Sequence, residues 1–549
     1  MFTVDIRING DHYKKIAYAK PLSISEILKE NVEKEEQIIA CKVNNKFVNS
    51  RAIMSSDTII EGILRSSTAG DAIYKNTSLF ILCKAFNTIF GSDKKLVVEH
   101  SIGDGIYVEI IDYTFSEKEI NKLILEIENI IENEIPIEEV VVTSAEAEEI
   151  FTNQNRDDII KHIKHNSIKL QKCGDYHDYL IGETANNTKM IDCFEIVYHA
   201  PGLILRFPNR FTNKIDGEFQ LSRKLFSTHQ EHDKWLNILG VHFVNAINIA
   251  VQNYTITDLI QIEEALHEKK IIDIAKHITR KDDTKLVLIA GPSSSGKTSF
   301  AKRLFIHLRV NGIKPHILGM DDYFLPRNLT PKKENGDFDF ESIHSLDLEL
   351  LNNDLQKLLN GKEIELPRYN FKEGTREMSH NKLQLKENEI LLMEGIHGLN
   401  DALSSSVPFN QKLRIYVSAL NNLNIDAHNR IQTTDSRKIR RLVRDYNYRG
   451  HTGEQTLEMW DSVREGEDKN IFPFQENADF MFNSILTYEL GVLKKYILPI
   501  LHSVSEYSPH YAEALRLWET VEHIYNIRDD IVPTNSILRE FIGGSVFNY

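Results

Sequence analysis

Cysteines are few in this 549-residue chain, and long apolar runs and a leader-like start are absent. The four cysteines, Cys41, Cys83, Cys173 and Cys193, include no C-x-x-C pair, which favours reduced thiols over a disulfide framework. No apolar run approaches the roughly 20 residues that cross a bilayer. The first residues, MFTVDIRINGDHYKK, lack the basic segment and apolar core of a signal peptide. These absences predict a cytoplasmic protein with no membrane partner.

Positive charge is also in short supply. Lys and Arg number 65 against 80 Asp and Glu, a formal net charge of −15, which argues against nonspecific binding of a polyanion over most of the surface but leaves room for a local basic patch. The hydrophobic fraction of 41% is ordinary for a globular protein. A chain of this length predicts about two to four domains.

The residue pattern divides the chain into four predicted segments. Residues 1–65 alternate apolar and polar positions and predict a small β-rich module with one helix, in SISEILKE. Residues 66–228 mix helices and strands as an α+β domain, and residues 229–280 predict a helical connector. Residues 281–549 alternate strands and helices, which predicts a parallel α/β sheet with a C-terminal extension. In that extension PTNSILREFIGGS (533–545) has an apolar pattern typical of ordered structure.

One stretch, KLVLIAGPSSSGKTSFAKRL, fits the phosphate-loop pattern GxxxxGK[ST]. The apolar run 286–290 before it predicts a buried strand, and apolar residues at helical spacing follow it. This strand–loop–helix context indicates a site for ATP or GTP, because backbone N–H groups and a helix N-terminus converge on phosphate oxygens. We expect the phosphates to contact Gly291, Ser293, Ser294, Ser295, Gly296, Lys297, Thr298 and Ser299. Lys297 would reach the β/γ-phosphates and Thr298 would ligate Mg²⁺.

A guanine-reading motif raises a GTPase as an alternative. TNKID (Thr212–Asp216) contains NKxD, but a GTPase also needs DxxG after the phosphate loop, and no aspartate after Thr298 is followed by xxG. We therefore interpret NKxD as a loop between a helix and a strand.

Acidic residues follow two further strands predicted in the same sheet. PHILGMDDYF places Asp321 and Asp322 after a short strand, and EILLMEGIHGL places Glu394 at the end of another. Ligands collect at the carboxyl ends of parallel strands. A carboxylate there can take a proton from a substrate hydroxyl or organise Mg²⁺. Taken alone, a pair of aspartates is more typical of a solvated turn.

A basic segment, DSRKIRRLVRDYNYRG, places six cations within 13 residues of an acidic protein. They are Arg437, Lys438, Arg440, Arg441, Arg444 and Arg449. Such a run is usually a solvated helix face. After a phosphate loop and two acidic strand ends, it favours a lid that closes over the transferred phosphoryl group.

These motifs together resemble the uridine kinase and phosphoribulokinase family of P-loop kinases, from Leu286 to about Leu490. MDDYF matches the family's base motif, MEG its FEG, and the arginine run its R-x-x-R-R-x-x-R-D lid. The resemblance implies an ATP-dependent kinase with Mg²⁺. It implies catalytic roles for Asp321, Lys297 and Arg444, metal contacts from Thr298 and Glu394, ATP contacts from Arg440 and Arg441, and acceptor contacts from Asp321, Tyr323, Asp339, Tyr369, Arg376 and Arg437.

The segment that reads the acceptor departs from the family pattern P-x-Y-D-F-x-x-H-x-R. In PRYNFKEGTR, on a predicted loop, Asn370 replaces the aspartate and Gly374 the histidine. The loss of a polar group and the gain of room predict a broader, purine-tolerant acceptor range.

The N-terminal half resembles other modules. Residues 1–65 look like a TGS domain, a β-grasp fold, and residues from about 70 to 225 are similar to the editing-type domain of threonyl-tRNA synthetases. The family's HxxxH pair falls on Asn76 and Phe80, and its C-x3-H on Leu180 and Thr184, so editing chemistry is predicted to be lost.

A different alignment of the N-terminal half with the C-x3-H motif offers candidate zinc ligands instead. Cys173 and His177, with His162 and His165, are ligand types that zinc accepts, although a lone cysteine among histidines is more often structural.

The favoured function is transfer of the ATP γ-phosphate to a hydroxyl of a small acceptor, most specifically a nucleoside 5′-hydroxyl. A kinase for another sugar or a phosphorylated pentose is the alternative among enzymes. An RNA- or ribosome-associated regulator, binding RNA through the N-terminal half, is the alternative from another class. A homo-oligomer remains open.

Overall fold

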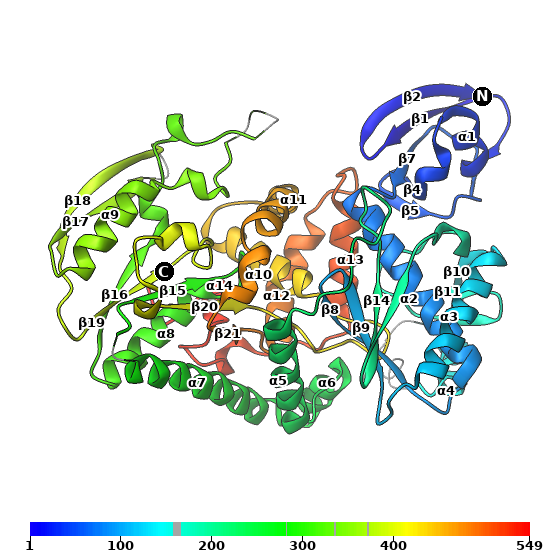
Figure 1. Cartoon of the computed structure of the whole chain (residues 1–549). Helices are drawn as coiled ribbons and strands as arrows, with labels where there is room; N and C mark the ends of the chain where they lie inside the picture. Colours follow the sequence, from blue (N-terminus) through cyan, green and yellow to red (C-terminus); the bar gives the residue numbers. More distant parts are fainter. Residues whose placement is uncertain (157–165, 282, 334–335, 337, 371–372, 549) are drawn as a thin grey trace.

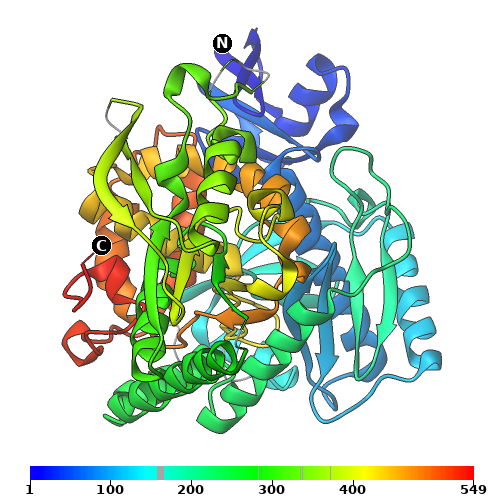
Figure 2. The same cartoon turned by 60° about the vertical axis from the view of Figure 1, so that its left-hand side comes forward.

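The chain forms mixed α/β structure with a β-rich module at one end and a parallel sheet at the other. The computed structural model describes residues 1–156, 166–281, 283–333, 336, 338–370 and 373–548. In both views (Figure 1 and Figure 2) the N-terminal module lies at the top of the molecule and the long helix α7 (Ile256–Arg280) runs along the opposite side. Among the described helices, none is long and apolar enough to span a membrane.

The N-terminal module is a five-stranded sheet that packs on one helix, α1 (Ile24–Asn31). Its strands are β1 (Phe2–Ile8), β2 (Asp11–Tyr18), β4 (Ile38–Val43), β5 (Lys46–Val48) and β7 (Thr58–Leu64), in the order β2-β1-β7-β4-β5, and β3 (Leu22–Ser23) pairs with β6 (Ile53–Met54). Val4 and Ile6, on alternate positions of β1, are fully buried with Ile27 of α1, as the alternating pattern predicts.

The next region packs around α2 (Thr68–Phe90), whose middle is apolar on every face and correspondingly buried. One antiparallel sheet contains β8 (Leu96–Ile102), β9 (Gly105–Ile110), β13 (Glu195–His199) and β14 (Gly202–Arg206), and a second contains β10 (Ile137–Thr143), β11 (Ser167–Cys173) and β12 (Tyr176–Asp178). Helices α3 (Glu117–Glu132) and α4 (Ser144–Asn153) complete the region, and each begins at a capping box.

Three helices lead into the C-terminal sheet: α5 (Arg223–Leu239), α6 (Val244–Gln252) and α7. The NKxD segment Thr212–Asp216 precedes α5 and follows β14. It is therefore a loop between a strand and a helix, as predicted.

The C-terminal sheet has the order β16-β19-β15-β20-β21, and every pairing in it is parallel, as predicted. Its strands are β15 (Leu286–Ala290), β16 (Lys314–Gly319), β19 (Glu389–Glu394), β20 (Lys412–Ser418) and β21 (Phe480–Asn483). Its helices are α8 (Lys297–Val310), α9 (Leu348–Leu359), α10 (Thr433–Tyr448), α11 (Gly453–Asn470), α12 (Glu489–His502), α13 (Tyr511–Glu522) and α14 (Arg539–Ile542). Residues of β15 are buried on both faces, which explains their continuous apolar run.

A hairpin and the C-terminal segment lie outside the order of this sheet. A hairpin of β17 (Ile364–Asn370) and β18 (Thr375–Leu383) carries Tyr369 opposite Arg376, so these residues lie on paired strands and not on the predicted loop. The C-terminal segment is ordered as predicted, because Ile537 and Phe541 are fully buried in the core that also contains β15.

Candidate active site

The phosphate loop connects β15 to α8 and has the conformation that its glycines allow. A Cβ atom on Gly291 would lie 2.0 Å from the Val417 carbonyl oxygen, so only glycine fits there. Gly296, with φ +82°, ends the loop, and α8 begins at Lys297. The N–H groups of the first turn of α8 therefore lie at the end of the loop, as in an anion site.

Lys297 and Thr298 occupy the first turn of α8. The Lys297 ammonium donates to the carbonyl oxygens of Gly291 at 2.8 Å and Pro292 at 3.0 Å. Burial lowers the pKa of Lys297, and the carboxylates of Glu394 and Glu540 oppose that shift. The Lys297 ammonium is therefore hydrogen-bonded to the phosphate loop itself. We expect a bound phosphate to lie beside it and to balance its positive charge.

Thr298 contacts Glu394, as the predicted metal-binding pair requires. The Thr298 hydroxyl donates to Glu394 Oε1 at 3.0 Å, and burial raises the pKa of Glu394 above its ordinary value, with Lys297 pulling it down. A hydroxyl and a carboxylate oxygen at this spacing fit Mg²⁺, a hard cation that takes oxygen ligands and keeps several waters.

Asp321 and Asp322 follow β16 in a short 3₁₀ turn and differ in their contacts. Asp321 stays accessible to solvent, although surrounding protein and Asp322 raise its pKa while Lys297 lowers it. Asp322 Oδ1 accepts the backbone N–H of Tyr369 at 3.3 Å. Asp322 thus holds the β17 strand, whereas Asp321 is open to a substrate.

The arginine run forms α10, and two of its arginines are buried in ion pairs. Arg437 is 1% exposed and pairs with Glu467, and Arg440 is 0% exposed and pairs with Glu489. Buried guanidinium groups need such partners. In this structure Arg437 and Arg440 therefore stabilise packing around the phosphate loop and are not on a free lid surface.

Arg441 and Arg444 are less deeply buried than Arg437 and Arg440. Arg441 donates to the Ser293 hydroxyl of the phosphate loop at 3.0 Å. Arg444 lies 4.0 Å from Glu540, and burial and Arg449 lower its pKa. We therefore expect Arg441 and Arg444 to be the α10 arginines that meet a bound phosphate.

Two glutamates that we did not predict occupy the phosphate loop. Glu467 of α11 accepts the backbone N–H of Ser293 at 2.9 Å, and Glu540 of α14 accepts from Ser299. Neither belongs to a motif in the sequence. The pattern of residues 533–545 indicated only order, and it gave no signal that the segment returns to the loop.

Two of the predicted acceptor residues, Tyr369 and Arg376, belong to the hairpin, and the others lie outside it. The Tyr323 hydroxyl donates to Asp354 at 3.2 Å, and Arg376 pairs with Asp347 at 2.8 Å. Tyr369 is 6% exposed. Asp339 is partly exposed, and its backbone N–H bonds the Pro331 carbonyl oxygen at 2.7 Å.

Gly374 does not open the expected room. Its φ is +69°, and a Cβ atom there would lie 2.8 Å from Nε of Arg327. The Arg327 side chain therefore fills the space beside the glycine, and the prediction of a roomier pocket is wrong at this position. The loss of the histidine as a polar group still holds.

The two positions that match the editing HxxxH pair, Asn76 and Phe80, carry no histidine. Asn76 donates to the Glu183 carbonyl oxygen at 3.2 Å and Phe80 is fully buried.

In the antiparallel β11–β12 pair, Lys172 lies opposite His177, so Cys173, one residue further, points to the other face of the sheet. Cys173 and His177 therefore cannot share a metal. His162 and His165 lie outside the described residues.

Comparisons with known proteins match the part of the chain that holds this site. The profile of the Phosphoribulokinase / Uridine kinase family matches residues 286–490. A uridine kinase of Geobacillus sp. (strain WCH70) is 30% identical over 194 residues, which cover 35% of this chain and 82% of the relative. A uridine kinase of Ureaplasma parvum serovar 3 is 25% identical over 215 residues, 39% of this chain and 95% of the relative. A solved structure described as a possible uridine kinase from Bacillus stearothermophilus has 18% identity and a TM-score of 0.24, and the alignment covers 36% of this chain and 89% of that one.

Proposed function

Because this chain belongs to the phosphoribulokinase/uridine kinase family, we propose that it transfers the γ-phosphate of ATP to a nucleoside 5′-hydroxyl. At the coarser level, it is an ATP-dependent phosphotransferase that acts on a hydroxyl group of a nucleoside or sugar. A sugar or a phosphorylated pentose is the alternative acceptor.

The proposal depends on one juxtaposition of charged and polar groups. Thr298 lies 3.0 Å from Glu394 at the end of β19, and Asp321 follows β16, the strand that pairs with β19. A phosphate-binding turn, a pair of metal-ligand oxygens and an accessible carboxylate therefore share one edge of the sheet. In-line phosphoryl transfer requires these three components.

Each component has a role in the proposed reaction. The loop N–H groups and Lys297 bind the β- and γ-phosphates. Asp321 orients the acceptor hydroxyl and takes its proton. Arg444 and Arg441 stabilise charge on the transferred group. Thr298 and Glu394 would hold Mg²⁺, which neutralises charge on the phosphate oxygens when it is bound.

A panel of nucleosides and sugars tests this function directly. We expect ADP production that depends on an added nucleoside, with phosphorylated nucleoside as the second product. ADP release that is stimulated by RNA and needs no acceptor would support the RNA-associated regulator instead.

For the rest of the chain we propose the following organisation. Residues 1–65 form a TGS-like β-grasp module, for which the parallel β1–β7 pairing and the single helix are support. Residues 66–228 form a domain like the editing domain of threonyl-tRNA synthetases, without its chemistry. Residues 229–280 connect these to a kinase domain, residues 281–549. RNA remains a candidate partner of the N-terminal half.

A further inference from the structure

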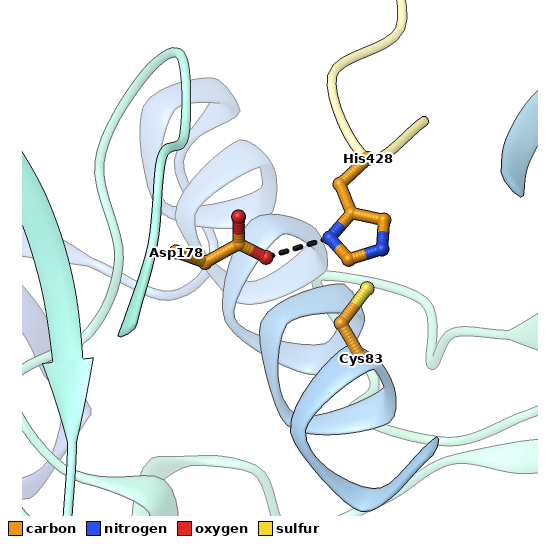
Figure 3. A group of neighbouring side chains, drawn as sticks. All are labelled: Cys83, Asp178 and His428. Atoms are coloured by element: carbon orange, nitrogen blue, oxygen red, sulfur yellow. Dashed lines mark hydrogen bonds and ion pairs between the residues drawn. The ribbon is translucent and has the colours of Figure 1, made fainter. Parts of the chain in front are cut away.

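A thiol, an imidazole and a carboxylate meet far from the phosphate loop. Cys83 comes from the buried side of α2, Asp178 from the end of β12, and His428 from the segment between β20 and α10. Figure 3 shows the three side chains pointing toward one another, and their candidate ligand atoms lie within 4.8 Å of one another. Two of them precede the kinase sheet in the chain, and the third follows β20.

Hydrogen bonds already orient two members of this cluster. His428 Nδ1 lies 2.7 Å from Asp178 Oδ2, and the Tyr176 hydroxyl donates to the same oxygen at 2.8 Å. Arg156 pairs with the other Asp178 oxygen and with Asp426. Tyr176 and Arg156 are outer partners of the kind that orient a metal-binding carboxylate.

Charged groups surround the three side chains. Asp178 and Asp426 both pair with the Arg156 guanidinium, and His428 lies against Asp178. Burial, with both carboxylates, raises the pKa of Cys83 well above its usual range, so Cys83 carries a thiol until a cation displaces its proton.

A cavity beside the cluster limits what can bind. It measures about 20 Å³, and its lining includes Cys83, Arg156, Tyr176 and His428. That volume admits a water molecule or an ion. It is too small for an organic substrate, and Cys83 is only 2% exposed, which argues against the alternative in which the thiol acts as a nucleophile. Lys94 also lines the cavity, and its ammonium is 3.4 Å from Glu119.

We propose that Cys83, Asp178 and His428 bind a zinc ion. Sulfur, nitrogen and oxygen ligands of this kind suit zinc, with a water molecule from the cavity as the fourth ligand. Zinc ligands in a tetrahedral site are about 3.4–3.6 Å apart, which side-chain adjustments of about 1 Å would reach from the present positions. On binding, the thiol proton leaves to solvent and the imidazole keeps one proton, on the nitrogen that zinc does not take.

Metal analysis of the full-length, tag-free chain tests the proposal. We expect about one zinc per chain, and a cobalt(II)-substituted protein with the near-ultraviolet absorption of a thiolate–cobalt bond. Cys83→Ser and His428→Gln should each weaken binding by more than the roughly 10–100-fold that an outer-shell change costs. Cys173→Ser, which removes another fully buried cysteine of the same half, should keep the metal.

Two results would overturn the site. One is wild-type protein that takes up no zinc or cobalt at micromolar concentrations, and the other is Cys83→Ser protein with unchanged metal content. If Cys83→Ser does not fold, the cobalt spectrum of the wild-type chain decides, because a spectrum without thiolate absorption excludes Cys83 as a ligand. Metal content is measured without turnover, so failure here leaves the proposed kinase function untouched.

Discussion

Glu540 accepts a hydrogen bond of 2.6 Å from the Ser299 hydroxyl and one of 3.3 Å from the Ser299 backbone N–H. Ser299 is the third residue of α8, and we expected its donors to contact an ATP phosphate. The glutamate comes from the C-terminal segment, 241 residues away in the chain. A carboxylate of the protein therefore occupies donors at the N-terminus of α8 that we propose an anionic nucleotide would use.

Glu540→Gln should bind ATP more tightly than the wild-type chain. Two unit charges about 4 Å apart repel by about 4 kcal/mol at an effective dielectric constant of 20, and the amide keeps a hydrogen-bond acceptor for Ser299. We expect roughly tenfold tighter ATP binding by calorimetry. Asp530→Asn is the matched control, because Asp530 pairs with the exposed Arg528. Weaker ATP binding by Glu540→Gln would mean that the carboxylate assists the nucleotide.

Much of this site could be predicted because its residues stand next to their structural context in the sequence. The run before Gly291 and the helical pattern after Thr298 place the phosphate loop, and the strands before Asp321 and Glu394 place both acids at one sheet edge. Glu540 could not be predicted in this way. Its position depends on a tertiary path that returns the end of the chain to the loop, and no local pattern encodes such a path.

The arginine run of α10 also shows what local sequence cannot predict, namely which of its arginines are buried in ion pairs. Its spacing predicts cations near a phosphate, and Arg441 contacts Ser293 of the phosphate loop. Sequence spacing does not indicate which arginines have buried partners, since Glu467 and Glu489 belong to later helices. The filled space beside Gly374 has the same cause, because Arg327 is distant in the chain.

Lys297→Ala should lose turnover. The variant lacks the cation that meets the transferred phosphate, and stabilisation of this kind contributes about 10²-fold or more to kcat. Initial rates of ADP production measure it. Arg309→Ala, at an exposed position of the same helix, is the control. Near-normal turnover of Lys297→Ala would contradict the assignment of the phosphate loop.

Asp321→Asn should nearly abolish transfer while ATP still binds, because the base acts on the acceptor. Surrounding protein and Asp322 raise its pKa, so the loss of kcat/KM toward acid should begin at a higher pH than for an ordinary aspartate, as the base becomes protonated. Asp322→Asn should be milder, since an amide oxygen can still accept the Tyr369 N–H. Rates and pH profiles of both variants separate the two roles, and the reverse order would identify Asp322 as the base.

Arg440→Met should unfold at a lower temperature. The change leaves Glu489 buried without its partner, and breaking such a pair costs about 3–5 kcal/mol. Thermal unfolding measures it, with Arg449→Met as the control because the Arg449 side chain is 50% exposed. The double variant Arg440→Met/Glu489→Leu should recover part of the loss. An unchanged melting temperature for Arg440→Met would show that α10 is loosely held.

Acceptor specificity should be broad among ribonucleosides. The position that carries a histidine in the family pattern is Gly374, whose φ of +69° favours glycine, so one polar group that could read a base is missing. Arg376 pairs with Asp347, and the Arg327 guanidinium beside Gly374 is a donor without the hydrogen-bond acceptor that a neutral histidine ring has. Discrimination by shape alone supplies about 1–3 kcal/mol, roughly 10–200-fold.

We therefore expect kcat/KM values for purine and pyrimidine ribonucleosides within that range. A preference for uridine above about a thousandfold would contradict this expectation, because it exceeds the discrimination that shape alone supplies. Arg327→Ala then serves as the second test: removal of the side chain beside Gly374 should widen the acceptor range further while ATP binding stays unchanged.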